Sequence, residues 1–153
     1  MFETIDDIYN HLGLSMFEHL PEKWEKAYLE VNLHQVNVSV SIDSKYIYNG
    51  KIFDFDLDVI DGIYKNSMCN KAFYALYTIM QKDKNDVPWN KARFEMTSEG
   101  DFSIDFKYDE DFAWYKSLDI DSQKYDELDI NVINKIKSWD GLPKGYPRYW
   151  TKR

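Results

Sequence analysis

The sequence predicts an α+β fold in a single domain that spans all 153 residues. Two patterns lead to this prediction. Several stretches alternate apolar and polar residues with a period of two, as half-buried strands do, and others repeat apolar residues at helical spacing. Short turns join the strands, which indicates antiparallel pairing. We therefore expect an antiparallel sheet of four to five strands from two hairpins, packed against a central helix, with N- and C-terminal helices.

The clearest hairpin runs from Pro88 to Tyr108. Apolar residues alternate with charged or hydroxyl residues in both arms, and Thr97–Asp101, with Gly100, supplies the turn. A slip of one residue would turn the apolar face outward, so the register is well determined. It pairs Met96 with Phe102, Phe94 with Ile104, Ala92 with Phe106, and Arg93 with Asp105.

A first helix is expected over residues 3–19, where Thr4 and Asp7 resemble a capping box. The central helix is expected over residues 66–82, with a broad apolar face. A stretch without clear period, 116–126, is interpreted as loop, and a final helix is expected over 128–139. Residues 140–153 are expected to form a basic, aromatic strap that packs over the domain through Tyr146, Tyr149 and Trp150.

The other hairpin is expected between the first two helices. Residues 24–33 alternate between two faces of a strand, with Trp24 on the outward face. Residues 36–42 show the same alternation and form the expected partner strand. His34–Gln35 would form a two-residue turn between the strands, although its residues are poor for so tight a turn.

A second turn is expected at Asp43–Ser44, followed by a short strand over 46–48 that Asn49-Gly50 closes. Residues 51–59 then alternate apolar residues with Asp54, Asp56 and Asp58. This segment fits either an edge strand, where outward charge discourages aggregation, or an extended linker into the next helix.

The chain is acidic, with 19 Lys and Arg against 27 Asp and Glu, a net charge of −8. Nucleic-acid-binding domains carry the opposite sign, so we expect no direct contact with nucleic acid. An acidic surface favours basic partners and also serves solubility. One cysteine excludes an internal disulfide, and neither a signal peptide nor a run of roughly 20 apolar residues is present. We expect a soluble, cytoplasmic protein without membrane contact.

No catalytic, metal-binding or cofactor motif is found, so we expect no catalytic residues, metal or cofactor. A calcium loop starting at Asp54 would need glycine at Val59 and glutamate at Lys65. Asp105 and Asp109, which flank Tyr108, could form an acid–base pair, so a carboxylate-based and possibly metal-dependent hydrolase stays an alternative. An acidic DNA-mimic regulator is another.

Charge is distributed unevenly. Residues 99–111 sum to −5 and residues 119–129 to −4, whereas residues 135–153 sum to +5. The basic tail could lie along an acidic face of its own chain, or the acids could meet a partner. Exposed acid beside aromatic residues is typical of contacts with basic partners. The predicted partner-binding residues are Asp105, Asp109, Glu110, Asp111 and Trp114, and secondarily Asp54, Asp56 and Asp58.

Several segments resemble the YezG-like immunity proteins, the antitoxins of bacterial polymorphic toxin systems. Residues 20–28, LPEKWEKAY, resemble the family's LPxxWEKVY opening, and residues 99–109 resemble its GxFxxxFxYxD element. The Tyr46 and Tyr48 strand, the apolar helix over 73–80, Pro88-Trp89 and a closing Gly141-Leu142-Pro143 follow the family's order. The resemblance covers roughly residues 16–143.

The resemblance implies an immunity-type domain without enzymatic activity. Such proteins bind a cognate toxin domain, often a C-terminal nuclease, and neutralise it in the producing cell. The first hairpin is shorter than in the family, and the basic tail, residues 144–153, departs from its pattern. The identity of the toxin, the binding face and the oligomeric state stay open.

Overall fold

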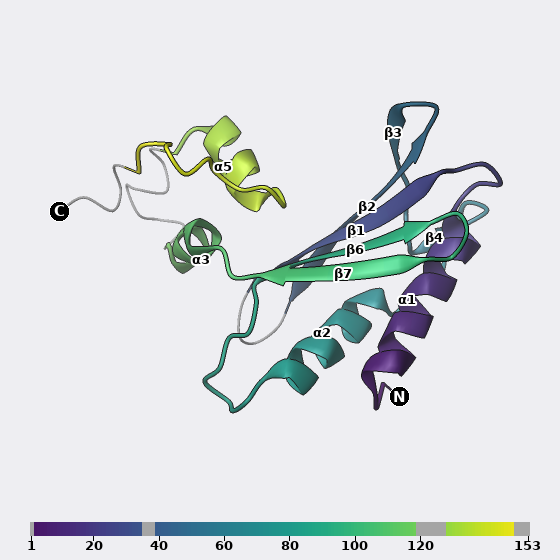
Figure 1. The fold of residues 1–153 in the computed structure, drawn as a ribbon, viewed down its shortest axis with the longest axis horizontal. Coiled ribbons are helices and arrows are strands. Elements are labelled where there is room, and N and C mark those ends of the chain that lie inside the picture. Colours follow the sequence, from purple (N-terminus) through teal and green to yellow (C-terminus); the bar gives the residue numbers. More distant parts are fainter. Residues whose placement is uncertain (1, 35–38, 119–127, 149–153) are drawn as a thin grey trace.

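A computed structural model describes residues 2–34, 39–118 and 128–148. The α+β fold is confirmed, with a five-stranded antiparallel sheet (Figure 1). The helices are α1 (Ile5–His19), α2 (Cys69–Met80), α3 (Glu110–Ser117) and α5 (Ile130–Lys137). The sheet strands are β1 (Lys26–Leu33), β2 (Val40–Tyr48), β3 (Lys51–Asp54), β6 (Lys91–Thr97) and β7 (Phe102–Lys107), and a separate ribbon holds β4 (Val59–Ile60) and β5 (Ile63–Tyr64).

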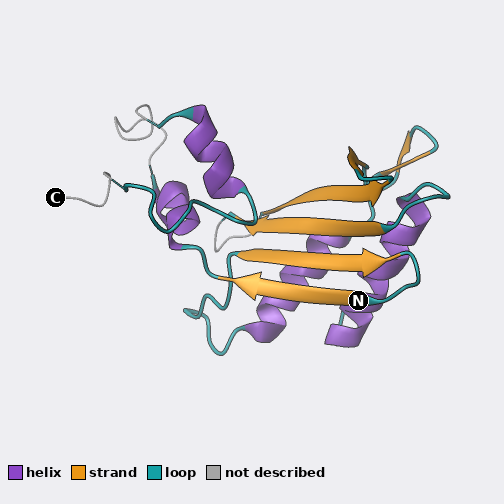
Figure 2. Cartoon of the chain, turned by 45° about the horizontal axis from the view of Figure 1, so that its top comes forward, coloured by secondary structure: helices purple, strands orange, loops and turns teal. Residues whose placement is uncertain are grey.

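The sheet has the strand order β3-β2-β1-β6-β7, so β3 and β7 are its edges. Helices α1 and α2 lie across one face, whereas α3 and α5 lie together near one end of the sheet (Figure 2). No helix of the described residues covers the remainder of the second face, as Figures 1 and 2 both show.

The main core forms between the sheet and its two covering helices. The predicted capping box starts α1, because the Thr4 hydroxyl accepts the Asp7 amide and the Asp7 carboxylate accepts the Thr4 amide. Apolar residues at helical spacing then meet the inward residues of the strands. Fully buried members are Ile8, Leu12, Met16, Leu29, Val31, Phe73, Leu76, Trp89 and Phe94.

A second, smaller core joins α3 to α5. Phe112 and Tyr115 from α3 pack with Ile133 and Ile136 from α5. Neither helix would be stable alone, because an isolated helix of eight residues is marginal in water. Each is therefore stabilised by packing against the other. The helix α3 was not expected from the sequence, whereas the final helix was.

The predicted register of the second hairpin is confirmed. The structure pairs Met96 with Phe102, Phe94 with Ile104, Ala92 with Phe106, and Arg93 with Asp105. Gly100 lies in the turn with φ +95°, a conformation that glycine adopts without strain.

The first hairpin differs from the prediction in both turns. Leu33 pairs with Val40 and the His34 amide donates to the Ser39 carbonyl, so the turn at His34–Gln35 is wrong. Gln35 and the expected strand residues 36–38 lie outside the described residues. The turn at Asp43–Ser44 is also wrong, because β2 runs straight through both residues, held by eight pairings to β1. Tertiary pairing thus overrides the local preference of Asp and Ser for turns.

The Asn49-Gly50 turn is confirmed, with φ values of +54° and +73°. It leads into β3, so the start of the 51–59 segment is an edge strand and its remainder leaves the sheet. The ribbon at residues 59–64 turns at Asp61-Gly62 and was not expected. Trp24 was expected outward but lies in the core, because it precedes β1 and packs edge-on against Phe17.

Candidate partner-binding surfaces

The predicted partner-binding residues fall into two separate regions. The first, the α3 acidic segment, consists of Asp105 in β7, Asp109 before α3, and Glu110 and Asp111 in its first turn. The second, the acidic cleft, contains Asp54, Asp56 and Asp58 together with Asp43, which the sequence analysis assigned to a turn. The carboxylates of the two regions differ in their binding partners and in their exposure.

Asp109 is bound from within the molecule. Its Oδ1 accepts the Phe112 amide at 3.1 Å, which caps α3, and its Oδ2 accepts the Lys91 ammonium at 2.7 Å. The Lys91 side chain is 0% exposed and Asp109 11%. Burial acts to raise the pKa of Asp109, but the hydrogen bonds from Lys91 and Phe112 outweigh it and hold that pKa below its ordinary value.

Lys91 also joins the two cores. Its ammonium donates to the carbonyls of Ile136 and Ser138, each at 2.6 Å, at the end of α5. The expected charged face of β6 therefore does not present Lys91 to solvent. Gly141 packs against the same group, because a Cβ there would lie 2.7 Å from Asp109 Oδ2. The closing Gly141 of the sequence pattern thus has a steric reason.

Asp111 holds the tail of its own chain. Arg148 donates from Nε and Nη2 to the two carboxylate oxygens, at 2.9 Å each, and from Nη1 to the carbonyls of Lys144 and Tyr146. The alternative that the basic tail lies along its own acidic face is therefore confirmed for Arg148. Tyr146 is half-buried, and Tyr149 and Trp150 lie outside the described residues. Trp114 is half-buried against the second core.

Asp105 and Glu110 are the two exposed carboxylates of the α3 acidic segment. Although Asp105 lies opposite Arg93 as predicted, the Arg93 guanidinium pairs with Glu95 at 3.3 Å and covers the Tyr28 ring at 4.5 Å. Among the described residues, no ion pair forms with Asp105 or Glu110. Asp109 is bound by Lys91 and Phe112, and its pKa lies below the ordinary value, which does not suit the acid–base pair weighed from the sequence.

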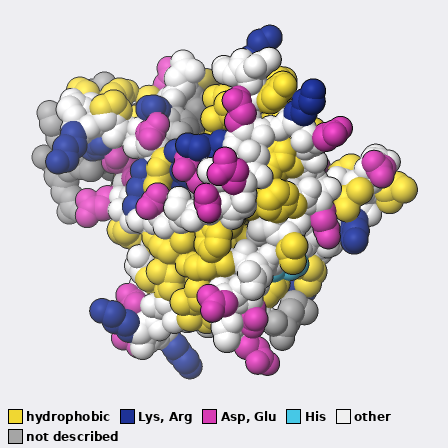
Figure 3. Space-filling view, turned by 45° about the vertical axis from the view of Figure 1, so that its right-hand side comes forward, with side chains coloured by type: hydrophobic (Ala, Val, Ile, Leu, Met, Phe, Trp, Pro, Cys, Tyr) yellow, Lys and Arg dark blue, Asp and Glu magenta, His cyan; other side chains and the backbone are white. Residues whose placement is uncertain are grey.

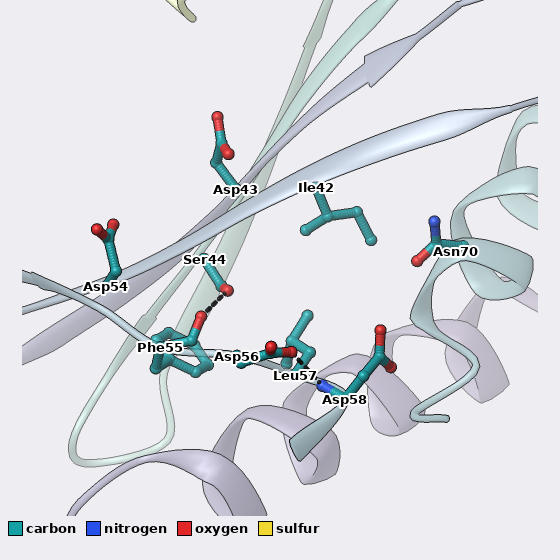
Figure 4. Close-up of a pocket in the computed structure, with 9 residues that line it drawn as sticks. All are labelled: Ile42, Asp43, Ser44, Asp54, Phe55, Asp56, Leu57, Asp58 and Asn70. Carbon is teal, nitrogen blue, oxygen red and sulfur yellow. Dashed lines mark hydrogen bonds between the residues drawn. The ribbon is translucent and has the colours of Figure 1, made fainter. Parts of the chain in front are cut away.

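The acidic cleft has a volume of about 600 Å³ and lies where β3 leaves the edge of β2 (Figure 4). Ile42, Asp43 and Ser44 of β2 form one side, residues 54–58 the opposite side, and Asn70 of α2 the end. The Ser44 hydroxyl donates to the Phe55 carbonyl and fixes the point where the two sides meet.

The lining of this cleft contains four carboxylates and no Lys or Arg. Asp56 Oδ1 accepts the Asp58 amide and Asp58 Oδ1 accepts the Ser67 amide, both at 2.8 Å, which holds the loop in shape. Asp54 forms an ion pair with Lys45 in solvent, at the rim. Asp43 is exposed and has no ion pair or hydrogen bond to another described side chain. Negatively charged residues therefore line the cleft, and Asp56 and Asp58 each use one carboxylate oxygen in a bond to the backbone.

Asp43 and Asn70 are the cleft residues that sequence reasoning missed. The sequence does contain a signal that places Asp43 in a strand. One alternation of apolar residues, at Val40, Ile42, Tyr46 and Tyr48, continues through the supposed turn. Within the described ranges, no group of three or more His, Cys, Asp or Glu residues is placed to hold a metal ion.

A face seen in Figure 3 shows apolar side chains gathered at its centre among acidic and basic ones.

Comparisons with known proteins give one clear result. No curated protein matches the chain. No helix in the described part of the chain is both long and apolar enough to cross a membrane. The model of the family described as "Immunity protein YezG-like" matches residues 5–145, which is most of the chain. The chain belongs to the YezG-like immunity protein family, which suggests an immunity function, implies a cognate toxin partner and is usually non-enzymatic.

Proposed function

We propose that this chain binds a toxin domain through the acidic cleft and neutralises it in the cytoplasm of the cell that makes both. The toxin domain is proposed to be a nuclease carried at the C-terminus of a polymorphic toxin. The observation that carries the proposal is the cleft itself, a hollow of about 600 Å³ with four carboxylates and no basic residue.

A nuclease is the toxin class that this surface fits. A nuclease must bind phosphates, so its active-site face is basic. Complementary charge across an interface accelerates association and selects the partner. An acidic hollow can receive a protruding Lys or Arg of such a face and cover the residues around it.

The cleft is favoured over the α3 acidic segment because its carboxylates are more accessible. Asp43, Asp54 and Asp56 are exposed, and the ion pair of Asp54 with Lys45 lies in solvent. Asp109 and Asp111 are held by Lys91 and Arg148, so a partner would have to break these pairs to use them. Asp54, Asp56 and Asp58 stay in the proposed site, with Asp43 added. Asp105 and Glu110 are exposed and serve as the comparison surface.

The test measures binding to the toxin domain encoded beside this gene, with the toxin's catalytic site mutated for safety. Calorimetry gives affinity and stoichiometry, and stopped-flow measurements give the association rate at several salt concentrations. In the cleft variant, Asp43→Asn, Asp54→Asn and Asp56→Asn are combined, because asparagine keeps the hydrogen-bond acceptor at Asp56. We expect the association rate at low salt to fall about tenfold and to depend less on salt.

The control combines Asp105→Asn and Glu110→Gln, which removes two exposed charges from the other region. We expect it to associate at nearly the unmodified rate. If the control slows and the cleft variant does not, the binding face is wrong. If the unmodified chain neither binds the toxin domain nor blocks the active toxin, the proposed function is wrong.

A further inference from the structure

The acidic cleft contains an open stretch of sheet edge. β3 pairs with β2 only from Tyr48–Lys51 to Lys45–Asp54. One more bond follows, from the Phe55 amide to the Ser44 carbonyl at 3.1 Å, and then the chain turns away toward β4. Within the described part of the chain, no strand therefore neighbours the edge of β2 before Ser44. Figure 4 shows this edge facing residues 54–58 and Asn70 across the cleft.

The main chain of Ile42 points into this gap. In antiparallel pairs, alternate residues direct their N–H and C=O groups to the same neighbour. The His34 amide bonds to the Ser39 carbonyl at 2.9 Å, in the register that pairs Asn32 with Ser41 and Glu30 with Asp43. Ser41 and Asp43 thus bond to β1, and Ile42 faces the other way. None of the described residues bonds to the Ile42 N–H or C=O on that side.

Both ends of this open edge are closed. The Val40 carbonyl accepts the Asn70 side-chain amide at 2.9 Å, and the Ser44 carbonyl accepts Phe55. Between these two bonded carbonyls lies a notch, in which Ile42 presents a donor and an acceptor beside a negative rim. Unpaired edge groups beside a hollow form a template for an added extended segment.

We propose that the toxin domain inserts an extended, basic segment into this notch and pairs it with β2 at Ile42. This inference rests on the proposed function and specifies how the partner is bound. Side chains alternate along an added strand, so the residue paired with Ile42 points to the same face of the sheet as the Ile42 side chain. In an antiparallel segment, one of its neighbours lies opposite Asp43. We assign that neighbour as Lys or Arg, because opposite charges stabilise a cross-strand pair.

Charge complementarity identifies the occupant. The lining contributes four acidic and no basic side chains, so an acidic or neutral segment would lose hydration without gaining an ion pair. A second copy of this chain is a weaker fit, because each copy carries a net charge of −8 and the two would repel each other. The toxin surface supplies the required charge under the proposed function.

Amide hydrogen exchange, followed by NMR, tests the pairing at a single residue. In the free chain, we expect the Ile42 amide to exchange much faster than those of Ser41 and Asp43, which bond to β1. On adding the catalytically inactive toxin domain, the Ile42 amide should slow at least tenfold. The Ser41 and Asp43 amides are the internal reference for any general stabilisation.

The outcomes separate this inference from the proposed function. If the toxin domain binds and is neutralised while Ile42 exchange stays unchanged, strand addition is wrong and the proposed function stands. If no complex forms, both are wrong. If Ile42 becomes protected in the chain alone as its concentration rises, a second copy occupies the notch and the assigned partner is wrong.

Two substitutions give a second readout. Ile42→Pro removes the N–H that faces the notch and leaves the bonds of Ser41 and Asp43 to β1 in place. Ile42→Val keeps the N–H and the branched side chain as the matched control. We expect at least a tenfold loss of affinity for the toxin domain with proline and little change with valine, with thermal melts confirming that both variants fold. Equal affinity of two folded variants would contradict the pairing.

Discussion

The α3 acidic segment and the acidic cleft are both rich in carboxylates, but these carboxylates differ in how far they are buried. In both, an aspartate pairs with a lysine at short distance, Asp109 with Lys91 and Asp54 with Lys45. In the first pair, Lys91 is fully buried and Asp109 is nearly so, and the pair joins the two cores. The second is in solvent, with the Asp54 side chain 81% exposed.

The difference lies in what surrounds each pair. Lys91 is enclosed by the ends of α3 and α5 and donates to two carbonyls as well as to Asp109. Lys45 stands on the open face of the sheet. Density of acid along the sequence therefore does not tell which acids a partner can reach.

The largest effect is expected from Lys91→Ala. The substitution leaves the Asp109 carboxylate and the carbonyls of Ile136 and Ser138 without their donor in a buried place, at a cost of about 3–5 kcal/mol in the free energy of unfolding. Urea denaturation measures it. The matched control is Lys45→Ala, which removes the partner of Asp54 and should cost less than about 1 kcal/mol. Equal losses would contradict the comparison.

A smaller effect is expected from Gly141→Ala. Gly141 has φ +71°, and a Cβ would lie 2.7 Å from Asp109 Oδ2. Backbone strain and the displaced carboxylate together should cost about 1–3 kcal/mol. Gly50→Ala is the control, because Gly50 has φ +73° with nothing within 4 Å of a Cβ. The difference between their denaturation midpoints isolates the close approach to Asp109, and no difference would show that Asp109 moves freely.

The smallest effect on stability is expected from lowering the pH. The folded state holds the pKa of Asp109 below its ordinary value of 3.8, so it stabilises the fold above that value. This contribution is lost as the pH falls through the folded pKa. Thermal melts between pH 7 and pH 3 should show a shallower acid slope for Asp109→Asn than for the unmodified chain. An equal acid slope for Asp109→Asn and the unmodified chain would contradict the assignment to Asp109.

The sequence predicted best where period and packing agree. The register of the second hairpin was found in full because its apolar residues alternate on both arms without interruption. The course of β2 was missed at Asp43 and Ser44, whose preference for turns is local, whereas β1 holds them in a strand. The helix α3 was missed because its eight residues have no distinct apolar stripe.

The site was harder to predict than the fold. Alternation placed Lys91 correctly on the outward face of β6, but nothing local shows that α3 and α5 cover that point. Asp54, Asp56 and Asp58 were singled out by their spacing. The cleft they line depends on where β3 separates from β2 and on Asn70 of a distant helix, which no single stretch encodes.

The contacts of Lys91 also set the order in which the protein can be completed during translation. Its carbonyl partners at Ile136 and Ser138 follow it by 45 and 47 residues. At about 5–20 residues per second, they emerge on the order of 2–9 s later. Until then the ammonium group stays hydrated and this end of the sheet stays open. A ribosome that stops before residue 136 releases a chain with the main core but without the second one, so the second core requires translation through Ser138.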